Sequence, residues 1–201
     1  MPGEVPFKGG FLQVSDSVYA PAEDSFLLAE AVCAEKRAAS AKLALDLGTG
    51  SGIQAINLAL LGAGKVVAAD INGCALRDAR ANAERFGISR RVSAVHSDMF
   101  SSLRGTKFDF IVFNPPYVPS GEPELRDVDG GKRGREALDR FLSRFGKHLN
   151  TEGVCYFMQS SLNGTARTEM LLKRNGFGFR IAARKRLFFE ELLVYRCVHA
   201  H

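Results

Sequence analysis

The stretch Leu43-Ala44-Leu45-Asp46-Leu47-Gly48-Thr49-Gly50-Ser51-Gly52 decides which fold the chain adopts. Its first half is a short apolar run that predicts a buried strand. Glycines at alternate positions follow, and they let the backbone turn sharply and approach a ligand closely. The next residues place Ile53, Ile56 and Leu60 on one face of a helix. A strand, a glycine-rich turn and a helix in this order predict an α/β domain with a ligand at the turn.

The rest of the chain repeats this alternation. Further strands are expected at residues 65–69, 91–96, 108–113, 153–159, 177–183 and 190–198. Helices are expected at residues 21–37, 73–86, 136–149 and 165–175, whereas the basic segment 184–186 is expected to join the last two strands directly. The pattern predicts one α/β domain with a doubly wound, Rossmann-like, seven-stranded, mostly parallel sheet and an antiparallel closing hairpin. We assign residues 21–201 to this domain and residues 1–20 to an N-terminal arm with one short strand at 11–19.

The composition is that of an ordinary globular protein of 201 residues, with 46% hydrophobic and 24% charged residues. No apolar run approaches the length of a membrane span, and the first residues lack a signal-peptide pattern. The net charge of +5 suits a partner on or near RNA, but such an excess is more often a solvated surface. We expect free thiols in a reducing compartment, and no metal site, because no Cys-x-x-Cys spacing relates Cys33, Cys74, Cys155 and Cys197.

Acidic residues near the ends of the first three strands suggest what the turn binds. Asp46 would repel a phosphate and suits a cationic ligand, and no Gly-Lys-Ser/Thr follows the glycines. Asp70 ends the second strand about 20 residues after the glycines, where an acid binds ribose hydroxyls; the alternative is that it serves only the cap of the next helix. Asp98 follows the third strand and can accept a hydrogen bond from an exocyclic amine, with Met99 or Phe100 packed on the ring.

The fourth strand ends in Asn114-Pro115-Pro116-Tyr117. A residue before proline is held extended, and two prolines fix the backbone and aim their carbonyl groups rigidly. The Asn114 side-chain oxygen and the Pro115 carbonyl then form a stiff pair of acceptors beside the Tyr117 ring. Such a pair suits a planar –NH2 group, whereas the alternative is a proline-rich turn that only closes a strand.

Two further segments flank this edge. The polar connection 118–135 contains four glycines and is long for a loop inside one domain, so we expect a flap that faces the substrate. Glu23 and Asp24 lie in the first turn of the first helix, where acids favour the helix dipole; alternatively, they reach into a cofactor site.

Together these residues resemble class I S-adenosylmethionine-dependent methyltransferases. Residues 45–52, Asp70 and Asp98 match the cofactor signature of that family, and Asn114-Pro115-Pro116-Tyr117 narrows the resemblance to enzymes that methylate adenine, cytosine or glutamine nitrogens. Residues 18–28 and 130–136 are similar to the archaeal and eukaryotic branch of the HemK-type protein glutamine methyltransferases. The resemblance runs from about Val18 to the C-terminus and departs at Gly73, where the family often has proline.

The resemblance implies a cytoplasmic enzyme that uses S-adenosylmethionine to N5-methylate the glutamine of the Gly-Gly-Gln motif in a class I release factor. It also implies a heterodimer with a small zinc-binding activator protein, which pairs along the third-strand edge near Val92 and Ala94. The implied cofactor-binding residues are Tyr19, Glu23, Asp24, Ser25, Asp46, Gly48, Thr49, Gly50, Gly52, Asp70, Ile71, Asp98, Met99 and Asn114. The implied catalytic residues are Asn114, Pro115 and Tyr117, and the implied substrate-binding residues are Asn114, Pro115, Pro116, Tyr117, Gly130 and Gly131.

Three other functions compete with this interpretation. An adenine-N6 methyltransferase of nucleic acids would meet the same two N–H bonds, but it needs base flipping and usually a target-recognition domain, for which this chain has no room. We therefore expect no direct nucleic-acid binding. A cofactor-binding scaffold would not need the stiff acceptor pair. A nicotinamide oxidoreductase is disfavoured by Ile53, which stands where the dinucleotide fingerprint requires its third glycine.

Overall fold

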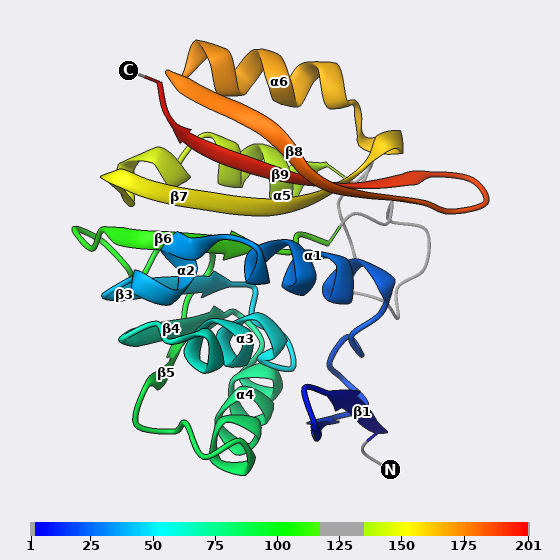
Figure 1. Ribbon diagram of the computed structural model, residues 1–201, viewed down its shortest axis with the longest axis vertical. Helices are drawn as coiled ribbons and strands as arrows, with labels where there is room; N and C mark the ends of the chain where they lie inside the picture. The colour runs from blue at the N-terminus through cyan, green and yellow to red at the C-terminus, as the bar shows by residue number, and fades with distance from the viewer. Residues whose placement is uncertain (1–2, 117–134, 201) are drawn as a thin grey trace.

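The computed structural model describes residues 3–116 and 135–200, and its centre is a seven-stranded sheet with the order β5-β4-β3-β6-β7-β9-β8 (Figure 1). Its strands are β3 (Leu43–Leu47), β4 (Lys65–Asp70), β5 (Val92–His96), β6 (Phe108–Phe113), β7 (Leu149–Ser160), β8 (Phe177–Arg186) and β9 (Glu191–His199). β3 to β7 are mutually parallel, and β9 runs antiparallel to both β7 and β8. The predicted doubly wound sheet with its closing hairpin is confirmed.

Helices cover both faces of the sheet. They are α1 (Glu23–Cys33), α2 (Lys36–Ser40), α3 (Ile53–Leu61), α4 (Gly73–Arg85), α5 (Glu136–Leu142) and α6 (Thr165–Arg174), with short 3-10 turns η2 (Phe145–Lys147) and η3 (Ser161–Asn163). α1 to α4 pack on the face that carries Phe110 and Val112, and α5 and α6 pack on the face that carries Ile111 and Phe113. Alternate residues of β6 are therefore buried on opposite faces. Within the described ranges, no helix has the length and apolar character needed to cross a membrane.

The N-terminal arm differs from the prediction. Instead of one short strand, it forms an antiparallel hairpin of β1 (Gly3–Phe7) and β2 (Gly10–Val14). The buried Asn82 side chain of α4 accepts a hydrogen bond from the Gln13 amide at 2.8 Å and donates one to the Gln13 carbonyl at 2.8 Å. Asp78, also on α4, accepts from the amide and hydroxyl of Ser15. These contacts fasten the arm beside the glycine turn.

Three predicted boundaries are wrong. The first helix ends at Cys33 because Glu35 turns away to accept hydrogen bonds from Arg196 and Tyr156. The helix that starts at Glu136 ends at Leu142, although Phe145 and Leu149 continue its apolar spacing. They belong instead to η2 and to the start of β7. The basic segment 184–186 extends β8 and is not a connecting loop.

Candidate active site

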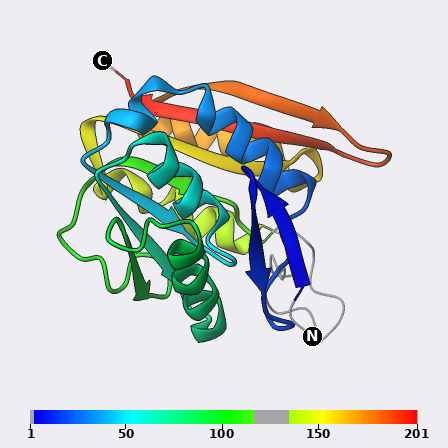
Figure 2. The same cartoon turned by 60° about the horizontal axis from the view of Figure 1, so that its bottom comes forward.

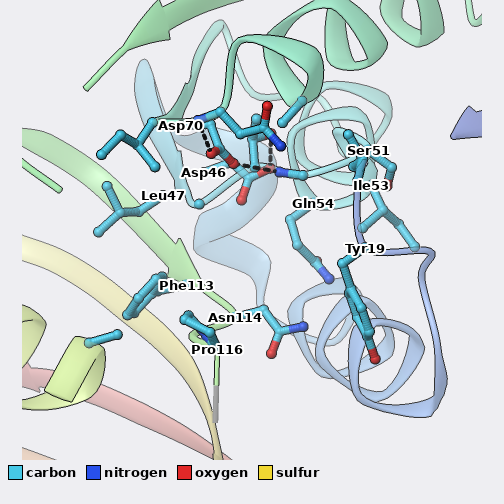
Figure 3. A pocket seen from close by; sticks show the side chains of 18 of the residues that line it. Tyr19, Asp46, Leu47, Ser51, Ile53, Gln54, Asp70, Phe113, Asn114 and Pro116 are labelled. Atoms are coloured by element: carbon cyan, nitrogen blue, oxygen red, sulfur yellow. Dashed lines mark hydrogen bonds between the residues drawn. The ribbon is translucent and has the colours of Figure 1, made fainter. Parts of the chain in front are cut away.

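A cavity of about 340 Å³ opens at the carboxyl ends of β3, β4, β5 and β6 (Figure 3), a volume within the usual range of about 300–1,000 Å³ for small-molecule sites. Parallel strands end at the same edge of a sheet, so segments far apart in sequence meet there. The predicted site residues that line the cavity are Tyr19, Ser25, Asp46, Gly48, Thr49, Gly50, Asp70, Ile71, Asp98, Met99, Asn114 and Pro116.

The glycine turn uses its glycines for two purposes. Gly48, Gly50 and Gly52 have φ values of +62°, +52° and +85°, a region in which a side chain is strained. A Cβ atom at Gly50 would meet nothing within 4 Å, so this glycine leaves space open where the turn lines the cavity. A Cβ atom at Gly52 would lie 2.9 Å from the Ala79 Cα atom. Gly52 does not line the cavity, and it permits close packing of the turn on α4.

Asp46 holds the turn against α3. Its buried Oδ2 atom accepts hydrogen bonds from the Thr49 hydroxyl at 2.6 Å and from the Ala55 amide at 2.9 Å. Figure 3 shows Asp46 beside the glycine turn. Burial raises the pKa of Asp46 to about 7, because the low-dielectric interior disfavours the charged carboxylate. Because Asp46 lines the cavity, a positive charge bound there would favour its ionised form.

Asp70 is held by backbone amides on both sides. Its Oδ2 accepts from the Gly50 amide at 3.0 Å, and its Oδ1 accepts from the Asn72 amide at 2.8 Å. A carboxylate has about four acceptor positions, so both oxygens can still accept from hydroxyl groups. Next to Asp70, the Ile71 side chain is 62% exposed although it is large and apolar, and it offers a surface on which a flat ring can lie.

Asp98 has a partner that the sequence did not indicate. Both of its carboxylate oxygens accept hydrogen bonds from Arg140 Nη2 of α5, at 2.8 and 2.7 Å, and Arg140 also lines the cavity. No local sequence pattern indicates this pairing, because the two residues are 42 positions apart.

The backbone at Met99 has an unusual conformation. Its φ is +50°, which is rare for a residue with a side chain, and its carbonyl accepts a hydrogen bond from the Ser97 hydroxyl at 2.7 Å.

The orientation of Asn114 is set from behind by α1. Its Nδ2 atom donates to Asp24 Oδ2 at 2.9 Å and lies 3.4 Å from Ser25 Oγ. Asp24 is itself buried, and its Oδ1 accepts from the Ser25 amide at 2.6 Å and from the Tyr19 hydroxyl at 3.2 Å. Because the amide nitrogen is bound to a carboxylate, the side-chain oxygen Oδ1 of this cavity-lining residue is left as an acceptor.

Three buried polar atoms around the cavity have no hydrogen-bond partner among the described residues: Ser51 Oγ, Gln54 Oε1 and Asn114 Oδ1. Buried polar atoms without partners are rare in folded proteins and costly. Ser51 and Gln54 were not predicted as site residues, because serine and glutamine at a helix start carry no signal of their own. Their convergence with Asn114 indicates a ligand that supplies the missing hydrogen bonds.

Several predicted site residues lie elsewhere. The Glu23 side chain is half-exposed, pairs with Lys185 at 3.0 Å and does not line the cavity. Pro115 is buried but is not a lining residue. Tyr117, Gly130 and Gly131 lie outside the described residues. In the part of the chain that the structure describes, no group of three His, Cys, Asp or Glu side chains could hold a metal ion.

Comparison with known proteins gives one consistent result. The profile of the methyltransferase small domain family matches residues 23–175. A Methanocaldococcus jannaschii protein, provisionally named protein N5-glutamine methyltransferase MJ0928, is 41% identical over 196 residues, which are 94% of this chain and 96% of that protein. Methyltransferase HEMK2 of Mus musculus is 32% identical over 192 residues, covering 89% of this chain and 88% of its own length. The E. cuniculi Mtq2–Trm112 complex, described as responsible for methylation of the eRF1 translation termination factor, matches with a TM-score of 0.73 at 28% identity, over 92% of this chain and 99% of that chain.

Proposed function

Since the chain belongs to the methyltransferase small domain family, and within it to the HemK-type protein glutamine methyltransferases, we propose that it methylates a release factor. The methyl group goes to N5 of the glutamine in the Gly-Gly-Gln motif of a class I factor. The observation that carries this proposal is the buried Asn114 Oδ1 atom, which has no hydrogen-bond partner among the described residues and belongs to a residue that lines the cavity. An acceptor held in this way suits a primary amide, whose –NH2 group supplies donors only.

The residues present fit S-adenosylmethionine as the cofactor. Asp70 would hold the ribose hydroxyls, Ile71 and Met99 would enclose the adenine, and Asp98 would accept from its amine. Asp46 would face the ammonium end, and the open space at Gly50 would admit the methionine part. When bound, this cofactor supplies a methyl group on a cationic sulfur that leaves as a neutral thioether.

The protein's own contribution to the reaction is positioning and electrostatics. An amide nitrogen is a weak nucleophile because its lone pair is shared with the carbonyl. Asn114 Oδ1 accepts one of its N–H bonds and thereby helps to aim the nitrogen at the methyl group. The acceptor role of the Pro115 carbonyl for the other N–H bond stays a prediction, because Pro115 does not line the cavity. Positive charge grows on that nitrogen as the N–C bond forms and the S–C bond breaks, and the acceptor dipoles stabilise it. The nitrogen then loses one of its two protons to water, which leaves the neutral N-methyl amide. Tyr117 lies outside the described residues, and its contact with the amide stays a prediction.

Asp24 acts through Asn114 and not through the cofactor. Its carboxylate accepts a hydrogen bond from the Asn114 amide, which fixes the side-chain oxygen toward the substrate. The negative charge behind the amide also polarises Asn114 and makes its oxygen a stronger acceptor. Neither Asp24 nor Glu23 lines the cavity, and the cofactor contacts that the sequence suggested for them stay predictions.

The activator is proposed to bind at β5, since this strand forms one edge of the sheet and no other strand of the described residues pairs with its outer side. We propose a heterodimer in the cytoplasm, where translation release factors act. The similarity to Mtq2, whose structure was solved in complex with Trm112, supports a two-protein assembly. An active, monodisperse enzyme that works fully alone would contradict this part of the proposal.

The test of function is transfer of label from S-adenosylmethionine, with and without a zinc-binding activator. The substrates are a class I release factor, its Gly-Gly-Gln→Gly-Gly-Ala variant, and single- and double-stranded DNA. Label on the unaltered factor alone is the expected result. Label on DNA but not on the factor would instead establish the adenine reaction, because adenine presents the same pair of N–H donors.

A further inference from the structure

The turn between β8 and β9 carries two aromatic side chains in water. The Leu187 amide donates to the Glu190 carbonyl at 2.8 Å, which places Phe188 and Phe189 at the tip of the hairpin. Phe188 is 91% exposed and Phe189 is 84% exposed, and their rings meet edge to face with centroids 4.6 Å apart. The hairpin extends well beyond the neighbouring strand β7 in both views of the molecule (Figures 1 and 2).

Neither the turn geometry nor the stability of the fold accounts for two phenylalanines at the tip of the hairpin. Turns of this length favour glycine, asparagine, aspartate or serine at the tip, because those residues suit the turn geometry. Folding gains little hydrophobic stabilisation from rings that remain in water. Adjacent exposed aromatic rings on a protruding element are typical of surfaces that bind another molecule.

The tip overhangs the same edge of the sheet as the candidate active site. Phe113 of β6 is paired with Phe157 of β7, so the next residues, Asn114 and Met158, lie at the same level. Met158 is paired with Val194 of β9, and Asn114 is therefore level with Val194 along the strands. Phe189 lies five residues beyond Val194, which is about 17 Å further along the strand direction at about 3.4 Å per residue. A third exposed apolar side chain, Leu162 at 71%, lies at this edge on η3, and η3 is joined to β9 by a hydrogen bond from the Glu191 amide to Ser161 Oγ.

Charge on the hairpin favours a protein as the occupant. Arg184 pairs with Glu191 at 3.8 Å, and Lys185 pairs with Glu23 at 3.0 Å. Of this basic segment, only Arg186 has no carboxylate partner among the described residues. A nucleic-acid backbone needs several free cations, whereas aromatic anchors beside one arginine are typical of the energetic centre of a protein interface.

We infer that Phe188 and Phe189, together with Leu162 and Arg186, form a docking surface for the body of the protein substrate. This inference rests on the proposed function and adds a second contact region about 20 Å from the reacting glutamine, judged from strand rise and spacing. A folded substrate spans this distance, but a short peptide around the glutamine does not. β8 and β5 are at opposite edges of the sheet, so the docking surface is separate from the edge proposed for the activator.

The test compares two substrates in the presence of the activator: an intact class I release factor, and a peptide with three residues on each side of the Gly-Gly-Gln glutamine. Three extended residues reach about 10 Å, which is too short to touch the tip. In the Phe188→Ser/Phe189→Ser variant, the KM for the intact factor should rise about tenfold or more, because buried aromatic anchors dominate protein interfaces. Neither kcat for the factor nor kcat/KM for the peptide should change. Met170→Ser, which alters an apolar residue of α6 that is 57% exposed, is the matched control and should change neither substrate.

Each other outcome has a distinct meaning. An unchanged KM for the intact factor, with the unaltered enzyme active on both substrates, overturns the docking surface and leaves the proposed function standing. An equal loss on factor and peptide also overturns it, since the tip would then act on the active site. If the Phe188→Ser/Phe189→Ser variant loses binding to ribosomal RNA but keeps its kcat and KM for the intact factor, the tip is a nucleic-acid surface instead. An unaltered enzyme that methylates neither substrate overturns the proposed function, and the docking surface with it.

Discussion

The two ends of β6 each carry a polar side chain, and the two are used in opposite ways. At the amino end, Asp109 Oδ2 accepts from the amides of Lys42 and Leu43, and Oδ1 accepts from Asn150 Nδ2 at 2.7 Å. At the carboxyl end, Asn114 has its nitrogen bound to Asp24 and its buried oxygen without a partner among the described residues. A saturated side chain stabilises the fold, whereas a buried acceptor left without a donor is suited to a ligand.

The largest effect is expected at the unsaturated end. Asn114→Ala removes the acceptor that positions the amide nitrogen, so kcat should fall about 10³-fold, as when a preorganised dipole is lost from an enzyme site. Cofactor affinity, measured by calorimetry, and the melting temperature should stay near those of the unaltered protein. Turnover within about threefold of normal would contradict the role given to Asn114, since a lost dipole of this kind costs far more.

Asp24→Ala tests the unsaturated end of β6 in a second way, because it keeps Asn114 but removes the carboxylate that binds its side-chain nitrogen. The remaining neighbour of Asn114 Nδ2 is Ser25 Oγ at 3.4 Å, so we expect kcat to fall about 10²-fold with a small change in cofactor affinity. Asp24→Asn should restore part of the turnover, since its side-chain oxygen can still accept from Asn114. A variant that loses cofactor affinity but keeps kcat would show instead that Asp24 contacts the cofactor.

Asp46 allows a pH test at the same end of the sheet. Burial raises its pKa to about 7, so the carboxylate is ionised only as the pH rises through that value. An ammonium group in the cavity binds the ionised form better. Affinity for S-adenosylmethionine should therefore rise about tenfold at most between about pH 6 and pH 8. In Asp46→Asn, whose oxygen can keep the hydrogen bonds from Thr49 and Ala55, titration calorimetry should show a flat profile. An unchanged slope would exclude Asp46 as the group responsible.

The smallest effect on turnover is expected at the saturated end. Asp109→Ala leaves the Lys42 and Leu43 amides without their acceptor, which should lower the free energy of unfolding by about 1–3 kcal/mol. The activity of the folded protein should stay within about twofold, because no atom of Asp109 faces the cavity. Thermal denaturation and activity per folded molecule measure the two effects separately. A large loss of kcat in fully folded Asp109→Ala would contradict the contrast between a structural amino end and a catalytic carboxyl end of β6.

The sequence was sufficient to predict those cavity-lining residues that directly follow a strand. Gly50, Asp70, Asp98 and Asn114 follow different strands, and the parallel sheet brings them to one edge without further information. Residues whose roles depend on helix rotation were harder to assign. Glu23 and Asp24 are neighbours in the first turn of α1, yet Asp24 faces Asn114 and Glu23 faces Lys185.

Tertiary packing decided the remaining differences. Arg140 enters the site because α5 packs against the segment that follows β5, where the Phe100 and Phe141 rings are stacked, and no local pattern pairs Arg140 with Asp98. The apolar spacing of Phe145 and Leu149 imitates a helix, but a close approach ended the helix early. A Cβ atom at Gly146 would lie 2.6 Å from the Phe177 ring, so this backbone is fitted to β8 and not to a helical continuation.

The most direct test of the account is tandem mass spectrometry of the release factor after reaction with the enzyme, its activator and S-adenosylmethionine. We predict one added methyl group on the side-chain nitrogen of the Gly-Gly-Gln glutamine, and an unmodified peptide when the enzyme carries Asn114→Ala. A methyl group on any other residue, or the same glutamine methylated by the Asn114→Ala enzyme at an undiminished rate, would contradict the account.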